Sequence, residues 1–324
     1  MRVIRDNIFQ LNNETAVTIG KFDGIHRGHR ELLDRILEKK SEGLEATVFT
    51  FDKSPAELFS GVSIPSLTTM EEKLRIFEHL GIDNVIVYPL NKESASIAPE
   101  DYITNILCKQ MKMKYIVAGE DLSFGNRGEG NAALVERMSY ANSDENKNDC
   151  VSQKKVNTSC CKLYDTEIIK KIIIDGDEVG STLIREIVSN GDMERAAKLI
   201  GVPYAVSGVV SHGRKLGREM GFPTVNIEVT NEKLMPPFGV YFAEVSIDGA
   251  HYNGITNIGC KPTVTNSNKI FAETNIFDFD DDAYDELITV KLMKFHRPEK
   301  KFASINELKR QIDMDIQKGK EFFL

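Results

Sequence analysis

Two histidines stand three residues apart in a glycine-rich stretch near the N-terminus, Thr18–His29, which contains TIGKFDGIHRGH. Apolar residues typical of a buried strand precede this stretch, and helical spacing follows it, which predicts a strand-to-helix turn. Gly20 and Gly24 let the backbone approach a ligand closely. The start of a helix offers free N–H groups and a positive dipole end, which suit phosphate. His26 and His29 share one face of that first turn and could donate hydrogen bonds or positive charge to a phosphate.

Two other interpretations of these histidines stay open from the residues alone. They could be surface residues of an ordinary strand-to-helix turn. They could also be zinc ligands, although the sequence offers no third and fourth ligand nearby. The glycines, the paired histidines and the strand-turn-helix context together favour a phosphate site.

A second stretch in the C-terminal half, residues 213–226, combines glycines with basic residues. Gly213 and Gly217 indicate a loop that can approach phosphates, and three basic side chains between 214 and 218 add positive charge. Thr224 and Asn226 alternate along the start of a predicted strand, so both side chains point to one face. A hydroxyl and an amide oxygen are hard ligands that suit Mg²⁺ beside ATP. The lysine motif of a P-loop is missing from the sequence, which excludes a Walker-type kinase.

The elements that must position the first stretch belong to an α/β pattern. Short apolar runs alternate with amphipathic helical segments, which predicts βαβ units on a parallel sheet. Strands are predicted at 16–19, 46–51, 85–88, 115–118 and 167–174, and helices at 29–42, 71–80, 99–111, from 181 and at 192–200. Residues 139–162 are polar with little periodicity, which is typical of a surface loop or a partly disordered insertion.

After Pro203 the pattern changes to alternating strands separated by turn residues, which predicts an antiparallel barrel or sandwich. A helix over 305–318 closes the chain. The six strands are predicted at 205–210, 225–229, 240–247, 252–258, 271–277 and 287–295. The fold class is therefore α/β followed by β, with a boundary between about residues 186 and 203 and domains over 1–186 and 187–324.

The bulk properties agree with two globular domains. A chain of 324 residues with 41% hydrophobic and 28% charged residues can form two cores. A net charge of −8 makes the chain a poor general binder of nucleic acid or of anionic membranes. The five cysteines are irregularly spaced, no apolar stretch approaches the roughly 18 residues of a membrane span, and charge appears too early for a signal peptide. We expect a cytoplasmic protein.

The first stretch resembles the Gly-x-Phe-Asp-Gly-x-His-x-Gly-His form of the nucleotidyltransferase signature found in bacterial FAD synthetases. This resemblance implies a Rossmann-like nucleotidyltransferase domain with His26 and His29 as catalytic residues. The residues that it implies for ATP binding in the same stretch are Gly20, Phe22, Asp23 and Gly24.

Two later segments resemble the same family. Residues 180–185, GSTLIR, match its Ser/Thr-x-x-Arg helix start, which implies that Ser181, Thr182 and Arg185 bind the β- and γ-phosphates of ATP. Ser181 or Thr182 can also cap that helix. Residues 119–125 match a third element at the carboxyl end of a strand, where Asp121 is a candidate for ligand contact. Asp121 could instead cap a turn.

The second stretch resembles the Pro-Thr-x-Asn motif of riboflavin kinases, whose fold is a small β-barrel. Further matches lie at 237–241, 257–263, 271–279 and 295–302. The resemblance implies that Glu273 is the general base for the riboflavin 5′-hydroxyl and that Thr224 and Asn226 hold Mg²⁺. Arg297 is a candidate for flavin contact, although it could be a solvent-exposed charge. ATP binding is implied for Gly213, Gly217, Pro223, Thr224 and Asn226.

Taken together, the matches identify the chain as a member of the bifunctional riboflavin kinase/FAD synthetase family. The family implies ATP-dependent phosphorylation of riboflavin to FMN and adenylylation of FMN to FAD, with riboflavin, FMN, FAD and ATP as partners. Three departures stand out: Lys53-Ser54 where Pro and His are usual, Gly180 where Ser is usual, and Asn275 where His is frequent. Lys53-Ser54 and Gly180 motivate one alternative, a riboflavin kinase with a weakened adenylyltransferase domain. A second alternative is a non-catalytic flavin or nucleotide sensor that keeps both pockets.

Overall fold

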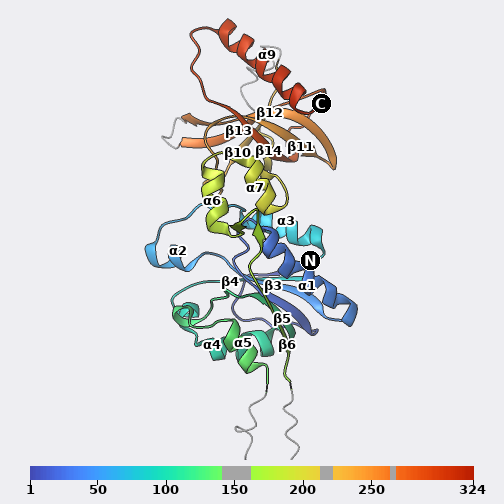
Figure 1. Ribbon diagram of the computed structural model, residues 1–324, viewed down its shortest axis with the longest axis vertical. Coiled ribbons are helices and arrows are strands. Elements are labelled where there is room, and N and C mark those ends of the chain that lie inside the picture. The colour runs from blue at the N-terminus through green and yellow to red at the C-terminus, as the bar shows by residue number, and fades with distance from the viewer. Residues whose placement is uncertain (141–161, 212–221, 263–267) are drawn as a thin grey trace, which may run out of the picture. The chain divides into compact units, whose positions relative to one another are not determined.

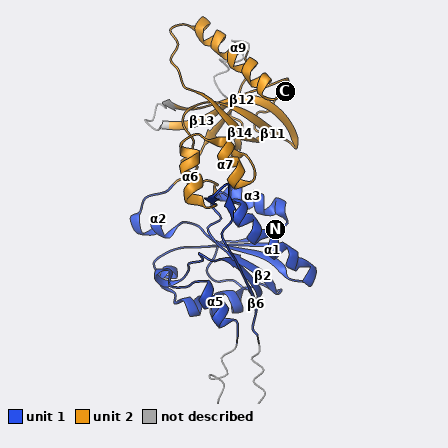
Figure 2. Cartoon of the chain, in the orientation of Figure 1, with its two compact units in different colours: residues 1–64, 70–178 blue, residues 65–69, 179–324 orange. Residues whose placement is uncertain are grey.

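The computed structural model describes residues 1–140, 162–211, 222–262 and 268–324. The chain forms two compact units, which Figure 2 distinguishes by colour. The first comprises Met1–Ile64 and Met70–Glu178, and the second comprises Pro65–Thr69 and Val179–Leu324. Most of the predicted insertion at 139–162 lies outside the described residues, as do Gly213 and Gly217.

The first unit is built on a six-stranded sheet in the order β1-β4-β3-β2-β5-β6, in which every neighbouring pair is parallel. The predicted parallel α/β sheet is therefore confirmed. The strand order reverses between β2 and β5, and open α/β sheets bind ligands at the carboxyl ends of the strands at such a point. The strands are β1 (Arg2–Ile4), β2 (Thr15–Ile19), β3 (Glu45–Phe51), β4 (Asn84–Tyr88), β5 (Met113–Gly119) and β6 (Asp165–Ile169).

Helices cover both faces of this sheet (Figure 1). Successive strand residues point to opposite faces, so Ala16 packs with α1 and α3, whereas Val17 packs with η3 and α5. Both faces of the central strands are therefore buried, which explains their continuous apolar runs. The helices are α1 (Arg27–Glu38), η1 (Lys39–Glu42), α2 (Pro55–Ser60), α3 (Met70–Leu80), η2 (Ser94–Ser96), α4 (Pro99–Asp101), η3 (Tyr102–Gln110), η4 (Asn126–Gly128) and α5 (Ala132–Met138).

Two elements of this unit differ from the sequence prediction. The helix predicted over 99–111 starts as α4 but continues as a π-helix, η3, in which the N–H of Met111 bonds the carbonyl of Ile106, five residues back. The strand predicted over 167–174 is broken after β6. Its last residues form β7 (Ile173–Ile174), which pairs with β8 (Asp177–Glu178) around a turn whose two residues, aspartate and glycine, both have positive φ.

The second unit begins with two helices and continues as an antiparallel sheet in the order β10-β13-β12-β11-β14-β9. A bridge between Val210 and Ile227 joins the two edges of the sheet, which curls into a nearly closed barrel. The predicted barrel and terminal helix are confirmed. The elements are α6 (Ser181–Ser189), α7 (Met193–Ile200), β9 (Tyr204–Val209), β10 (Val225–Val229), β11 (Gly239–Ile247), β12 (Ala250–Pro262), β13 (Asn268–Ile276), β14 (Leu287–Pro298) and α9 (Ile305–Phe322).

Alternate barrel residues fill the interior, including Ile227, Ala272 and Ile258, which are fully buried. The intervening residues point outward, and helix α9 packs on part of this outer face. There, an added Cβ at Gly319 would lie 2.8 Å from the ring of Phe277. A glycine at this position therefore lets the helix approach the barrel closely.

Candidate functional site

The loop between β2 and α1 has an unusual backbone. Phe22 and Ile25 have left-handed φ angles of 50° and 40°, and Gly24 has φ 84°. This conformation is strained for a β-branched residue such as Ile25 and persists only where the surroundings impose it. Both Phe22 and Ile25 are buried, so packing holds the loop in place. The loop stands at the carboxyl end of β2, beside the point where the strand order reverses.

The two histidine rings of this loop stack on each other, with centroids 3.7 Å apart and planes 16° apart. His26 is the N-cap residue of α1, and its Nδ1 accepts a hydrogen bond of 3.3 Å from the backbone N–H of His29. A neutral imidazole that accepts at Nδ1 carries its proton on Nε2. His26 therefore has one N–H donor left for a ligand.

Burial sets the charge of both histidines. It lowers the pKa of His26 to about 4, although the carboxylates of Asp23 and Asp121 act in the opposite direction. Burial also holds the pKa of His29 well below its ordinary value, with further lowering by His26 and Lys73. Both rings are therefore neutral at pH 7. Of the two roles that the sequence allows, the structure favours hydrogen-bond donation over positive charge.

The lowered pKa of His26 predicts that acid destabilises the first unit. Between pH 6.5 and about 4 the unfolded chain binds a proton on this residue and the folded chain does not, so stability falls as the pH falls through this window. The full effect is about 3 kcal/mol. Urea unfolding followed by circular dichroism at pH 7 and pH 4.5 measures the larger part of this effect. His26→Gln cannot titrate and should lose less stability over the same interval; an equal loss would contradict the assignment.

Asp121 follows β5, the strand next to β2, and its charge acts on His26. The structure therefore brings the predicted loops after β2 and β5 together at one edge of the sheet. Asp121 is exposed and forms an ion pair with Lys171, whose Nζ is 3.7 Å from its carboxylate. An added Cβ at Gly119 would lie 2.8 Å from that carboxylate, so a side chain there would displace it.

Two further side chains of this unit bear on the site. Lys73 of α3, which no motif in the sequence marks, is buried and donates a hydrogen bond of 3.2 Å to the carbonyl of Lys21. A lysine in an amphipathic helix carries no local signal of such a role.

Ser54, one of the unusual residues before Pro55, caps α2 in a reciprocal capping box with Glu57. The serine therefore has a structural reason to be there.

The predicted phosphate motif at 180–185 belongs to the second unit. The N-cap position of α6 is occupied by Gly180, so the prediction that Ser181 or Thr182 caps this helix is wrong. Arg185 lies one turn after the start of α6, and its Nη1 donates a hydrogen bond of 2.7 Å to the carbonyl of Pro65 in the same unit. Gly180, where the resembled family usually has serine, occupies the N-cap position with an extended backbone, and the helix has no side-chain cap hydrogen bond.

The barrel aligns three polar residues on adjacent strands. Asn226 of β10 lies directly opposite Glu273 of β13, which in turn lies directly opposite Asn257 of β12. Residues that face each other across a sheet point to the same side, so the three form a row with the carboxylate in the middle. Thr224 precedes Asn226 by two residues and lies immediately before β10, which begins at Val225. The sequence could not give this register, because it depends on pairing between distant segments.

Hydrogen bonds fix residues in and next to this polar row. Nδ2 of Asn275 donates a bond of 2.8 Å to the carbonyl of Pro223, at the start of the Pro-Thr-x-Asn segment. Nδ2 of Asn257 donates a bond of 3.3 Å to Glu299. Asn275, where the resembled family often has histidine, therefore anchors the segment that carries Thr224.

Arg297 binds Asp315 of α9. Its Nη2 and Nε donate bonds of 2.6 and 3.0 Å to one carboxylate oxygen, and Nη1 donates to the carbonyl of Pro298. His296 and Gln311 also contact Asp315, which is 2% exposed. This network ties α9 to β14 and gives Arg297 a structural role, while its contact with a flavin stays a prediction.

Removing the carboxylate should therefore destabilise the second unit. Asp315→Ala leaves the Arg297 guanidinium without its partner, at a cost of about 3 kcal/mol. Urea unfolding followed by circular dichroism measures the change. Asp313→Ala, at an exposed position of the same helix, is the matched control and should have almost no effect. Equal stability of the two variants would show that the network contributes little.

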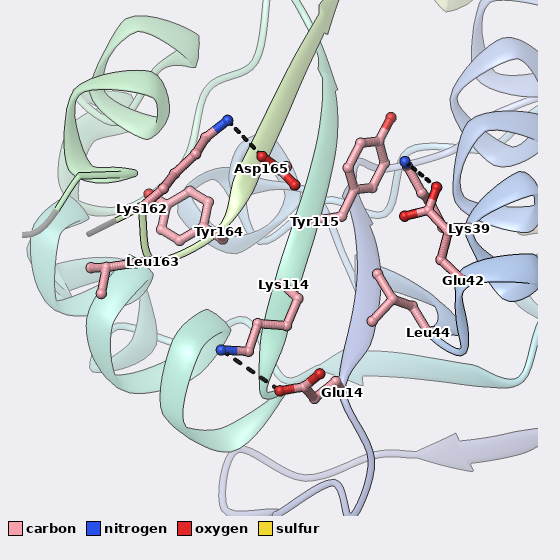
Figure 3. A pocket seen from close by; sticks show the side chains of 10 residues that line it. All are labelled: Glu14, Lys39, Glu42, Leu44, Lys114, Tyr115, Lys162, Leu163, Tyr164 and Asp165. Atoms are coloured by element: carbon pink, nitrogen blue, oxygen red, sulfur yellow. Dashed lines mark hydrogen bonds and ion pairs between the residues drawn. The ribbon is translucent and has the colours of Figure 1, made fainter. Parts of the chain in front are cut away.

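The pocket in Figure 3 lies at the opposite end of the first sheet from the histidines, beside the amino ends of β2, β5 and β6. Its lysines pair with acidic residues of the same pocket. Because these charges are already balanced, the pocket is no obvious phosphate site, and we place the candidate site at the carboxyl ends. The pairs are Lys39–Glu42, Lys114–Glu14 and Lys162–Asp165.

Within the described parts of the chain, no cluster of three or more His, Cys, Asp or Glu could hold a metal ion. The same parts contain no helix long and apolar enough to cross a membrane.

Comparisons with known proteins match both units. A family model of FAD synthetase matches residues 8–160, and one of riboflavin kinase matches residues 200–323. The bifunctional riboflavin kinase/FMN adenylyltransferase of Escherichia coli K12 is 33% identical over 331 residues, which cover 100% of this chain and 98% of that protein. The chain belongs to the bifunctional riboflavin kinase/FMN adenylyltransferase family.

Other members of the bifunctional family match this chain with similar identity and over a similar length. The protein of the same name from Haemophilus influenzae is 32% identical, with 100% of this chain and 99% of that protein covered. The one from Bacillus subtilis is 33% identical, with 96% and 93% covered. Among solved structures, one titled as a macrolide-efflux protein from Streptococcus pneumoniae has a TM-score of 0.78 at 27% identity, and the match covers 97% of this chain and 96% of that one.

The family matches confirm the domain order that the motifs predict. The FAD synthetase match includes His26 and Asp121, and the riboflavin kinase match includes Asn226 and Glu273. The Ser181–Arg185 motif falls between the two matches. Its part in the adenylyltransferase site is therefore carried by the motif resemblance alone.

Proposed function

We propose that this chain phosphorylates riboflavin to FMN in its barrel and adenylylates FMN to FAD at its parallel sheet, with ATP as the donor in both steps. One observation carries the proposal: each unit matches one enzyme family, the first unit stacks His26 on His29, and the second sets Asn226 directly opposite Glu273. On this basis we assign residues 1–186 to adenylyl transfer and 187–324 to phosphorylation, and we place the enzyme in the cytoplasm.

In the barrel, Glu273 acts as the general base. Its carboxylate takes the proton of the riboflavin 5′-hydroxyl as the hydroxyl oxygen bonds to the γ-phosphorus of ATP. The bond from that phosphorus to the β–γ bridging oxygen breaks, and ADP leaves. Asn226 and Asn257 flank Glu273 and keep the carboxylate in a polar row. ATP binding is assigned to Gly213, Gly217, Pro223, Thr224 and Asn226, and flavin contact to Arg297.

The row also suits Mg²⁺. Thr224 and Asn226 supply a hydroxyl and an amide oxygen, and the Glu273 carboxylate lies directly opposite Asn226, so the donors are the hard oxygen groups that this ion prefers. Thr224 and Asn226 would hold the ion. When bound, Mg²⁺ neutralises charge on the phosphate oxygens of ATP.

At the parallel sheet, an FMN phosphate oxygen attacks the α-phosphorus of ATP, the bond to the β-phosphate breaks, and pyrophosphate leaves. Negative charge grows on the α-phosphate oxygens, and the Nε2–H of His26 donates a hydrogen bond to them. A neutral, buried donor is strong here because little water competes with it. His29, whose ring stacks on His26, is the second catalytic residue of this site. Asp121 contacts the ligand. The remaining ATP contacts are assigned to Gly20, Phe22, Asp23, Gly24, Ser181, Thr182 and Arg185.

The direct test is to incubate the purified chain with riboflavin and Mg-ATP and to follow FMN and FAD separately by chromatography. The proposal expects FMN to appear first and FAD to follow at its expense. FMN without FAD would leave the kinase-only alternative, which the unusual Lys53 and Gly180 motivate. Binding of riboflavin and ATP without any product would leave the alternative of a non-catalytic sensor.

A further inference from the structure

A lysine ammonium is buried next to the glycine-rich loop of the first unit. Lys73 is 4% exposed, and its Nζ donates a 3.2 Å hydrogen bond to the carbonyl of Lys21. Burying an ammonium is costly unless it is paired and hydrogen-bonded. Burial lowers the pKa of Lys73, while the carboxylate of Asp23 acts in the opposite direction and favours the charged form. An apolar residue would fill this space at lower cost, so the charge calls for an explanation beyond packing.

Helix α3, which contains Lys73, also holds Phe22, the residue that follows Lys21 in the loop. Phe77 lies four residues after Lys73 on one face of α3, and its ring packs edge-to-face on Phe22 with centroids 5.7 Å apart. The Phe22 ring in turn lies 5.1 Å from that of His29. Helix α3 therefore fixes the carbonyl of Lys21 and the ring of Phe22, immediately where the backbone enters its left-handed conformation.

A second donor acts on the same carbonyl, but from a greater distance. The hydroxyl of Thr50 lies 3.5 Å from the oxygen of Lys21, at the limit of a hydrogen bond. The ammonium is the shorter contact and the charged one, and hydrogen bonds to charged groups are the stronger class. Its charge also reaches His29, whose pKa it lowers.

We propose that Lys73 is a positioning residue for adenylyl transfer: its bond to the Lys21 carbonyl holds the glycine-rich loop in the conformation that receives the phosphates of ATP. The inference rests on the adenylyl step proposed for this loop. Lys73 acts through the loop and through His29, and it is not placed in contact with the reacting atoms.

The test compares Lys73→Met with wild type in the full-length chain. Methionine keeps an apolar stem of similar length and removes the ammonium. Because a small displacement of a positioned group can cost about 100-fold, we expect kcat/KM for Mg-ATP in FAD formation to fall by roughly 10- to 100-fold. The KM for FMN and the rate of riboflavin phosphorylation should stay unchanged. Lys73→Arg, which keeps a charged donor, should recover part of the loss.

The matched control is Lys40→Met. Nζ of Lys40 also donates to a backbone carbonyl, that of Gly81 at 2.8 Å, but it lies after α1 at the amino ends of the strands. This variant should keep wild-type kcat/KM for both reactions. Unchanged kcat/KM for Mg-ATP in Lys73→Met would overturn the proposal. An equal fall of both activities with a lower melting temperature would overturn it too, since it would assign Lys73 to folding alone.

A measurement without turnover separates this inference from the proposed function. The chain is titrated with α,β-methylene-ATP while the His29 ring signals are followed by NMR. Weaker binding to Lys73→Met than to wild type, together with a higher pKa of His29 in the variant, supports the positioning role even if the wild type forms no FAD. Equal affinity in the two proteins overturns it, whatever the activity.

Discussion

Glu273→Gln should nearly abolish the conversion of riboflavin to FMN and leave the conversion of FMN to FAD intact. Glutamine has almost the same shape as glutamate and preserves the row with Asn226 and Asn257, but it cannot take a proton at neutral pH. A positioned general base contributes about 10²- to 10⁴-fold, so kcat for phosphorylation should fall by that factor. Separate assays with riboflavin and with FMN as the acceptor measure the two activities.

Glu228→Gln is the matched control for this experiment. Glu228 stands two residues after Asn226 on β10 and forms an exposed ion pair of 2.7 Å with Lys269. Its replacement should change neither activity, since exposed ion pairs contribute little. A wild-type rate of phosphorylation in Glu273→Gln would remove Glu273 from the role of base and would leave the polar row as a binding feature only.

The sequence predicted the architecture well where one local pattern decides the structure. The strands of the parallel sheet are continuous apolar runs because both of their faces are covered, and the barrel strands alternate because one face is inside. The glycine-rich turn was also predictable, since strand, turn and helix signals follow one another without a gap. In that turn, the spacing alone placed His26 and His29 side by side.

What the sequence could not show depends on contacts between distant segments. The bond from Lys73 to Lys21 joins residues 52 positions apart, and the Arg297–Asp315 network joins a strand to the terminal helix. The charge state of His26 likewise follows from burial, which is a property of the whole unit. A basic residue in a helix and one at a strand end look like solvent-exposed charges until the fold shows what covers them.

Local geometry also overrode two predictions. The helix at 99–111 has ordinary helical spacing, yet its hydrogen bonds widen to the π pattern in η3. The cap of α6 was assigned to a hydroxyl residue because such residues lead at N-caps, but Gly180 occupies that position with an extended backbone. In both cases the element was predicted and only its boundary or bonding differed. Ser181 and Thr182, which follow Gly180, lie on the first turn of α6.

His26→Ala should lower FAD formation by about 10²- to 10³-fold and leave FMN formation unchanged, because it removes the donor aimed at the growing charge on the α-phosphate. The alanine also removes the cap of α1, which costs about 1 kcal/mol of stability. His26→Asn separates the two effects, since an asparagine can cap the helix without an imidazole.

Both variants should therefore lose adenylyl transfer, and only the alanine variant should lose the cap. His79→Ala, at an exposed position on α3 in the same unit, is the control and should keep both activities. FAD formation at the wild-type rate in His26→Asn would mean that the imidazole serves the helix cap alone. The donor would then have to be sought in His29 or in the backbone N–H groups at the start of α1, where the same loop presents them to a phosphate.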